Sequence, residues 1–108
     1  MLALILFTTG SAVGQWSKLF SFNSQIFSTH FLSTIGKPNC GFVGTANGSV
    51  WRTTDNGRSW QKSVTPVNLN GPVTGFSFKD GATGWCSARQ TTLTPGIFKT
   101  IDSGKTWT

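Results

Sequence analysis

The chain carries the octad Thr53-Thr54-Asp55-Asn56-Gly57-Arg58-Ser59-Trp60 and, 47 residues later, Thr100-Ile101-Asp102-Ser103-Gly104-Lys105-Thr106-Trp107. Both octads place a hydroxyl residue, an Asp, a Gly, a second hydroxyl residue and a Trp at the same positions. Two copies at this spacing predict an array of similar supersecondary units, each too small to bury its own apolar face. The spacing fits the roughly 40 to 50 residues of a four-stranded β-propeller blade.

Each octad has the composition of a sharp turn between two strands. Its Asp is expected to accept hydrogen bonds from backbone amides one to three residues further on. Its Gly supplies a positive φ, and its Trp opens the next strand with the ring buried and the indole N–H available for a partner. We therefore predict a structural role, not a catalytic or metal-binding one, for Thr53, Asp55, Gly57, Ser59, Trp60, Thr100, Asp102, Gly104, Thr106 and Trp107.

The octads resemble the Asp-box, also called the BNR repeat, of sialidases, sortilin-type receptors, xyloglucanase-like hydrolases and photosystem II assembly-factor-like β-propellers. The residues before them extend the likeness to the assembly-factor-like repeats: Gly41-Phe42-Val43-Gly44-Thr45 with Gly48 to Asp55, and again, with drift, Gly84 to Ala88 with Gly96 to Asp102. The resemblance covers most of residues 15–108 and implies a β-propeller. In that superfamily the Asp-boxes lie away from sialidase active sites.

The expected fold is all-β, with about two four-stranded antiparallel blades of an incomplete β-propeller. Blade one is expected at about 21–64 and blade two at about 70–108, because β-branched and aromatic runs alternate with turn residues. Strands are predicted near 16–20, 26–33, 41–45, 49–54, 59–64, 73–78, 84–89, 96–100 and from 106 onward.

Residues 15–20 are predicted to be an outer strand whose hairpin partner lies elsewhere. Trp16-Ser17-Lys18 aligns with Trp60-Gln61-Lys62, 44 residues later, but no Asp-box precedes it. The resemblance implies that such a terminal strand helps to close the propeller ring. The alternative is that Trp16 is an ordinary core aromatic near an N-terminus.

Residues 1–14 have the outline of a signal peptide. A short apolar run at Leu2 to Phe7 is followed by small residues at positions 12 and 14, which suits cleavage before Gln15. The run is too short to span a membrane as a helix. No Lys or Arg precedes it, so a missing upstream start or a buried strand remains the alternative. We predict a secreted, periplasmic or cell-surface protein, with no integral membrane span after the signal is removed.

Two blades cannot close a propeller, which needs about four to eight. We therefore expect this chain to be a fragment of a larger protein, whose missing blades are its partners, or a piece that assembles with copies of itself.

The composition restricts the classes of partner. Nine Lys and Arg residues and three Asp residues, with no Glu, give a net charge of +6. The basic residues are spread singly, so we predict no nucleic-acid binding, while an anionic glycan or cell-envelope polymer stays open. Partner loops are expected near 34–40, 46–48, 79–83 and 89–95.

The composition also restricts catalysis. Glycosidases generally need two positioned carboxylates, and sialidases use a Tyr; this chain has no Glu and no Tyr. With Asp55 and Asp102 committed to turns, Asp80 is left alone, and we predict no catalytic residue and no cofactor. His30 is the single His, and Cys40 and Cys86 form no CxxC pair, so no metal site is predicted. The two Cys are either bridged or buried as small hydrophobes.

The function predicted first is a non-catalytic exported β-propeller module that serves as an interaction or assembly scaffold for a protein or glycan partner. The alternative is a fragment of a sialidase-like or xyloglucanase-like glycoside hydrolase whose catalytic residues lie outside this chain.

Overall fold

The computed structural model describes residues 3–8, 15–32, 37–89 and 95–108, and within these ranges it is all-β, with no helix. This confirms the predicted fold class at the level of secondary structure. The strands are β1 (Ala3–Thr8), β2 (Gln15–Ser21), β3 (Ile26–Leu32), β4 (Lys37–Thr45), β5 (Val50–Thr53), β6 (Gln61–Lys62), β7 (Val73–Phe78), β8 (Gly84–Ala88) and β9 (Gly96–Thr100).

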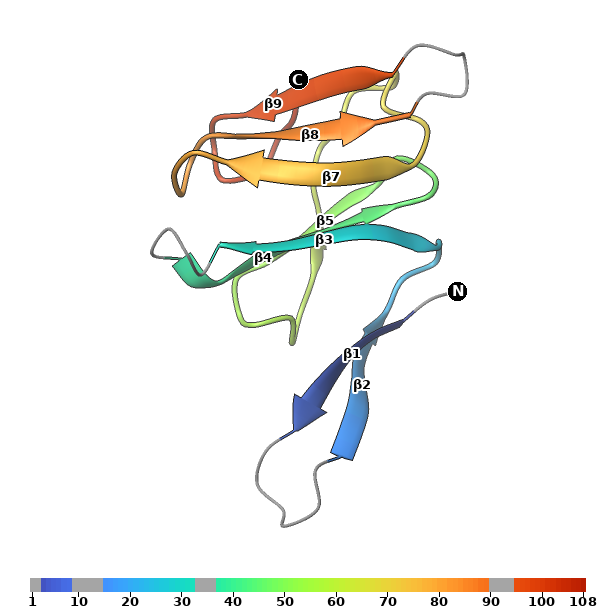
Figure 1. The fold of residues 1–108 in the computed structure, drawn as a ribbon, viewed down its shortest axis with the longest axis vertical. Helices are drawn as coiled ribbons and strands as arrows, with labels where there is room; N and C mark the ends of the chain where they lie inside the picture. Colours follow the sequence, from blue (N-terminus) through green and yellow to red (C-terminus); the bar gives the residue numbers. More distant parts are fainter. Residues whose placement is uncertain (1–2, 9–14, 33–36, 90–94) are drawn as a thin grey trace.

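The strands form two antiparallel sheets and a separate hairpin (Figure 1). The first sheet has the order β3-β4-β5-β6, the second has the order β7-β8-β9, and the N-terminal hairpin pairs β1 with β2. The strands predicted at 73–78 and 96–100 are confirmed. The strand predicted at 59–64 is shorter, because only Gln61 and Lys62 form ladder pairs.

No named strand follows β9 in the described residues. Instead of opening a strand, Thr106 forms an isolated parallel bridge with Val64. Thr108 and Lys99 do exchange two backbone hydrogen bonds, of 2.8 and 2.9 Å. This pair has the same place beside β9 that the Gln61–Arg52 pair has beside β5.

The two sheets have the same pairing register. Phe31 faces Gly41 across β3 and β4, and Phe78 faces Gly84 across β7 and β8. The register shifts between Ile26 and Ser28 in one sheet and between Val73 and Gly75 in the other. We call two residues equivalent when they hold the same place in these ladders. Equivalent residues are 47 apart on β3 and β7, 43 apart on β4 and β8, and 47 apart on β5 and β9.

The second sheet packs on one face of the first, with β7 lying beside β3 (Figure 1). Phe42 of β4 is fully buried at the centre of this contact, and its ring stacks on Phe78 with centroids 4.8 Å apart. Burial of such a ring contributes about 2 to 3 kcal/mol to folding. Gly44 allows β7 to approach, since a Cβ there would lie 2.5 Å from the Val73 Cβ. The Ser28 hydroxyl donates a 2.7 Å hydrogen bond to the Val73 carbonyl in the same place.

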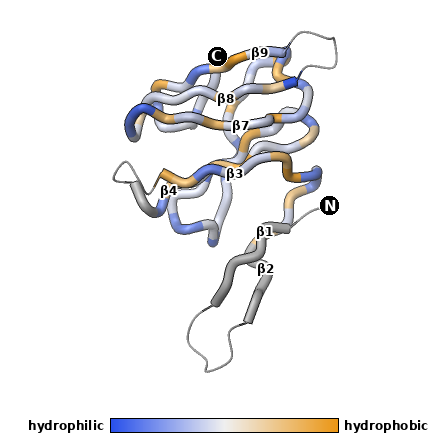
Figure 2. The backbone as a smooth tube through the Cα atoms, viewed as in Figure 1, coloured by the Kyte–Doolittle hydropathy of each residue, from blue (hydrophilic) through white to orange (hydrophobic). Residues whose placement is uncertain are grey.

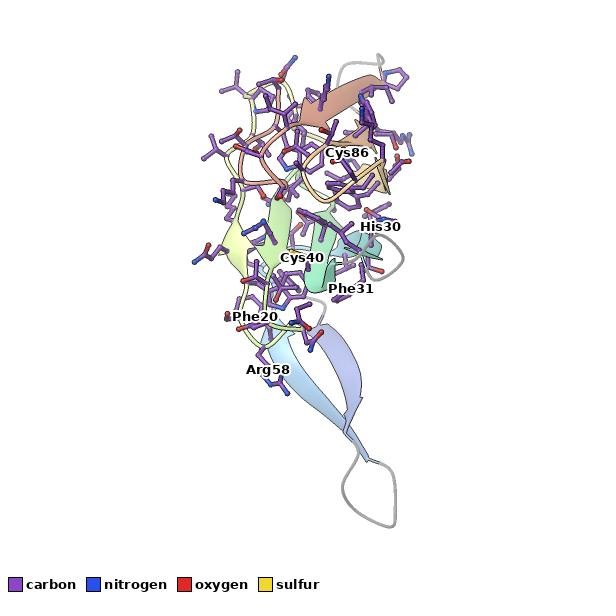
Figure 3. The ribbon with its side chains drawn as sticks, turned by 90° about the vertical axis from the view of Figure 1, so that its left-hand side faces the viewer. Phe20, His30, Phe31, Cys40, Arg58 and Cys86 are labelled. Carbon is purple, nitrogen blue, oxygen red and sulfur yellow. The ribbon has the colours of Figure 1, made fainter. Side chains whose placement is uncertain are left out.

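The opposite face of the first sheet is partly covered by Phe20, near the end of β2, and by Phe22, which follows it. Phe22 is 1% exposed, and its ring makes edge contacts with Trp51 and Trp60 at centroid distances of 5.6 and 5.4 Å. Phe20 lies against Phe22 and Trp51 at 5.0 and 6.0 Å. Figure 3 shows Phe20 where the hairpin meets the sheet, on the same side as Phe31.

The N-terminal hairpin corrects one prediction. β2 was expected to find its hairpin partner elsewhere, but it pairs antiparallel with β1, from Ala3 facing Ser21 to Thr8 facing Gln15. The sequence of β1 contains Ile5, Phe7 and Thr8, residue types that are enriched in strands. A strand at Ala3–Thr8 agrees with the alternative that residues 1–14 contain a strand. Their role as a signal peptide stays a prediction.

Candidate functional site

The first octad forms a closed network of side-chain hydrogen bonds around Asp55. One carboxylate oxygen accepts from the Ser59 amide at 2.9 Å and from the Thr53 hydroxyl at 2.8 Å. The other accepts from the Ser59 hydroxyl at 2.5 Å. The Thr53 oxygen in turn accepts from the Gly57 amide at 2.9 Å. Every fixed polar residue of the octad therefore closes the turn on itself.

The second octad repeats this network with the equivalent residues. Asp102 accepts from the Thr106 amide and hydroxyl at 2.9 and 2.6 Å and from the Thr100 hydroxyl at 2.9 Å. The Thr100 oxygen accepts from the Gly104 amide at 2.8 Å. One detail of the prediction is wrong in both turns: the amide that the Asp side chain binds lies four residues on, because the threonine hydroxyl takes the nearer glycine amide.

The backbone of each turn passes through the left-handed region twice. Gly57 and Gly104 have φ of 84° and 79°, as predicted, and the residues before them, Asn56 and Ser103, both have φ of 62°. Asn tolerates this conformation well, but Ser rarely adopts it. In the sequence, only the alignment of Ser103 with Asn56 indicates that Ser103 adopts a positive φ.

The network lowers the pKa of both carboxyl groups. The Ser59 hydroxyl, the Ser59 amide and the Thr53 hydroxyl together lower the pKa of Asp55 from 3.8 to about 2. The Thr106 hydroxyl is the main cause of the same shift at Asp102, whose pKa is also about 2. Donated hydrogen bonds favour the charged form of a carboxyl group. Both Asp residues are thus held as anions, the opposite of what a general acid requires.

The two octads differ in the bond that the Trp indole makes. The Trp60 indole N–H donates to the Gly57 carbonyl at 2.8 Å, which closes the turn. The Trp107 indole N–H is buried without a hydrogen-bond partner. Its equivalent acceptor, the Gly104 carbonyl, accepts a 2.5 Å hydrogen bond from the Ser63 hydroxyl instead.

The second sheet has a face that no other described strand covers. We call it the open face and define it by Ser77, Trp85, Ser87 and Ile97; the Lys99 ammonium lies 5.8 Å from the centre of the Trp85 ring. These residues line a hollow of about 300 Å³ together with Gly75, Phe76 and Cys86. Ile97 is 70% exposed. Figure 2 shows hydrophobic residues on β9, at the edge of the second sheet, as well as on β3 of the first.

A second, smaller hollow of about 80 Å³ lies where the first sheet meets the second octad. It is lined by Arg52, Gln61, Lys62, Ser63 and Lys105. The Arg52 Nε donates to the Ser103 carbonyl at 2.7 Å, so one of its donors is already used. Arg52, Lys62 and Lys105 bring three positive charges to this hollow.

The carboxylates do not converge on a common cavity. Asp80 accepts from the amides of Thr83 and Ala82 at 2.7 and 2.8 Å, and these bonds lower its pKa as well. Each Asp of the chain is thus committed to its own turn. None of the three lines either hollow described above.

Cys40 and Cys86 belong to the same buried core cluster, and His30 lies on Phe78 beside it. Cys40 and Cys86 are both buried and free, so no bridge joins them. Burial raises the pKa of the Cys86 thiol to about 12. His30 stacks on Phe78 at a centroid distance of 6.0 Å. Across the described ranges, no group of three His, Cys, Asp or Glu residues is arranged to hold a metal ion.

The predicted partner loops are only partly described. Positions 46–48 form a tight turn with Gly48 at φ of 84°, and 79–83 form the turn that Asp80 closes. Positions 33–36 and 90–94, within or beside the other two loops, lie outside the described residues.

Searches with protein-family models, among curated proteins and among solved structures found no match to this chain. In the part of the chain that the structure describes, no helix has the length and apolar character that crossing a membrane requires.

Proposed function

We propose that this chain is a non-catalytic module of a β-propeller, and that it acts as an interaction or assembly scaffold. The observation that carries the proposal is the stacking of two sheets of identical register, with the open face left uncovered. In this proposal the first and second sheets are successive blades, and the open face receives a further sheet of the same kind.

The packing of the first sheet supports this role for the open face. Val50 and Phe42 lie under the second sheet and are both 0% exposed. Their equivalents on the open face are Ile97 and Trp85, which are 70% and partly exposed. Two positions that are core in one sheet are therefore surface in the other, which is typical of a site that another sheet covers.

The turns support a structural role for the octads. Asp55 and Asp102 bind their own turns, and their low pKa suits a permanent hydrogen-bond acceptor rather than a group that transfers protons. We propose binding rather than catalysis for this chain on that ground. We also propose that the protein is exported, on the basis of its N-terminal sequence alone. We propose in addition that nucleic acid is not its partner, because its basic residues are spread singly.

A tandem chain tests the proposal. Gln61 and Thr108 are equivalent, so a second copy of Lys62 to Thr108, joined directly after Thr108, continues the pattern in register. We expect the added segment to fold onto the open face, to raise the unfolding midpoint in urea and to protect the amides of β8 and β9 from hydrogen exchange.

The matched control is the same tandem chain with Ile97→Lys in its internal copy only. It should lose the gain in midpoint, because a Lys ammonium cannot be buried without a partner. A tandem chain with no gain over the single chain would contradict the assignment of the sheets as blades.

A further inference from the structure

The open face has a complement within the same chain. Phe76 packs on the first sheet beside Phe42, but its equivalent, Thr29, is polar. The second sheet also packs on the first through four further apolar residues, of which all but Phe78 are at most 5% exposed: Val73, Phe78, Phe98 and Trp107. Their equivalents on the outer face of the first sheet are Ile26, Phe31, Trp51 and Trp60. We call these four the hairpin-side face. In both sets of four, one residue is β-branched and three are aromatic.

The hairpin-side face is incompletely covered. Phe20 and Phe22 lie on it, yet Ile26, Phe31 and Trp51 all remain partly exposed. The equivalents of Ile26 and Trp51, which are Val73 and Phe98, are 0% and 5% exposed under a complete sheet. Among the residues whose side chains the structure describes, Phe20 and Phe22 lie on this surface, whereas a whole sheet covers the equivalent surface of the second sheet.

We infer that two copies of this chain associate head to tail, the open face of one copy packing on the hairpin-side face of the other. The inference rests on the proposed stacking of the sheets as blades and names a second copy as the partner. By equivalence, Phe31 of the second copy stacks on Trp85 as Phe78 stacks on Phe42. Ile26 lies over Gly75 as Val73 lies over Ser28, but at a wider spacing, because Ser87 has a Cβ where its equivalent Gly44 has none. The segment at Phe20 to Phe22 shifts outward to admit the second copy.

A head-to-tail contact fits the hollow better than a symmetric one. The lining of the hollow of about 300 Å³ includes Ser77 and Trp85, the equivalents of His30 and Phe42, on which the Phe78 ring stacks inside the chain. A second open face offers no equivalent ring, since it would place Ile97 against Ile97. Each head-to-tail contact leaves one open face and one hairpin-side face at the ends, so association continues into rings or longer chains.

Charge makes the association depend on salt. Each copy carries a net charge of +6, so two copies repel each other at low ionic strength. The contact itself buries apolar surface, which salt does not weaken. Association should therefore increase with salt, the reverse of the behaviour of a complex held by ion pairs.

Sedimentation velocity of the purified chain over a range of concentration and salt provides the first test. We expect dimers and larger species, and Ile97→Lys should lower the association constant about tenfold or more. Ile101→Lys is the matched control: Ile101 is 71% exposed, and its equivalent, Thr54, is exposed as well and lies outside the contact between the sheets. A monomer at all concentrations, or equal effects of the two variants, would overturn the inference.

Cysteine cross-linking tests the geometry. A Cβ at Gly75 has only the Ser87 hydroxyl near it, at 3.6 Å, so Gly75→Cys fits the strand. Oxidation of a mixture of Gly75→Cys and Ile26→Cys chains should link these two peptides between copies, as identified by mass spectrometry. Cys40 and Cys86 are buried and should stay out of the products. Cross-linking of Gly75→Cys chains to one another alone would show a symmetric contact and overturn the inference.

The two proposals can fail separately. If the tandem chain gains stability while the mixed cysteine variants give no cross-link, the sheets stack as blades and the second copy is the wrong occupant. If the tandem chain shows no gain, the stacking itself is wrong, and the head-to-tail contact falls with it.

Discussion

The Ser63 hydroxyl donates a hydrogen bond of 2.5 Å to the Gly104 carbonyl oxygen, which joins the end of the first sheet to the turn of the second octad. Two backbone bonds reinforce the link: the Val64 amide donates to Lys105, and the Trp107 amide donates to Val64, both at 2.9 Å. Ser63 thereby takes the acceptor that Trp107 would use if its octad matched the first. The Gly104 carbonyl thus accepts from the first sheet, whereas the Gly57 carbonyl accepts from the Trp60 indole of its own octad.

Removal of the Ser63 hydroxyl should return that acceptor to Trp107. We expect Ser63→Ala to lower the free energy of unfolding by no more than about 1 kcal/mol, because the Trp107 indole N–H can then donate to Gly104 as Trp60 donates to Gly57. The measurement is urea unfolding together with the exchange rate of the two indole protons. The Trp107 indole should exchange more slowly in the variant, and the Trp60 indole serves as the internal control. An unchanged Trp107 exchange rate would show that the acceptor was not recovered.

Gly104 should tolerate no side chain. A Cβ at this position would lie 2.1 Å from the Phe42 ring, and the φ of 79° strains any other L-residue. We expect Gly104→Ala to lower the free energy of unfolding by more than about 2 kcal/mol, the sum of backbone strain and overpacking.

A double-mutant cycle with Phe42→Leu separates the two causes. The smaller Leu side chain relieves the overlap but not the positive φ, so the double variant should lose less stability than the two single variants combined. Simple additivity would mean that the Phe42 contact does not limit position 104.

The stability of the fold should depend on pH through the two octads. The folded pKa values of Asp55 and Asp102 are about 2, below their ordinary value of 3.8. A lowered folded pKa means that the folded state releases these protons more readily than the unfolded chain. The stabilisation is therefore complete above pH 3.8 and is lost as the pH falls toward 2. Urea midpoints measured across this range should fall with pH, and less steeply in Asp102→Asn.

Replacement of a donor tests the cause of that pKa shift. Thr106→Val keeps the shape of the side chain but removes the hydroxyl that donates to Asp102 at 2.6 Å. The pKa of Asp102 should rise toward its ordinary value while that of Asp55 stays low, as followed by NMR titration of the carboxyl carbons. Equal shifts at both residues would point to general unfolding at low pH instead of a local loss of the donor.

The two thiols should be protected in the folded protein. Cys86 is 1% exposed with a pKa of about 12, so very little reactive thiolate is present at neutral pH. Alkylation without reductant should label neither Cys in native buffer and both in denaturant. A denatured protein that takes up no label would reveal a disulfide, contrary to the structure.

Several features of the fold follow from local chemistry and could be predicted from the sequence. Val73 to Phe78 alternates and forms a strand, and Gly57 and Gly104 take the positive φ that their turns need. These outcomes depend on residues a few positions apart, so neighbouring side chains and backbone sterics determine them. In each octad the two hydroxyl residues bind the Asp carboxylate, a pairing that the sequence did not specify.

The contacts between the sheets could not be predicted in this way. Only the tertiary structure decides that Ser63 reaches Gly104, that β1 becomes the partner of β2, and that the Trp107 indole is left unpaired. Equivalent residues such as Val50 and Ile97 have similar side chains, yet one is buried and the other is exposed. The sequence by itself determined the turns and most of the strands, because those depend on short-range geometry. Their burial depends on which surface packs against which, and that is a property of the folded arrangement.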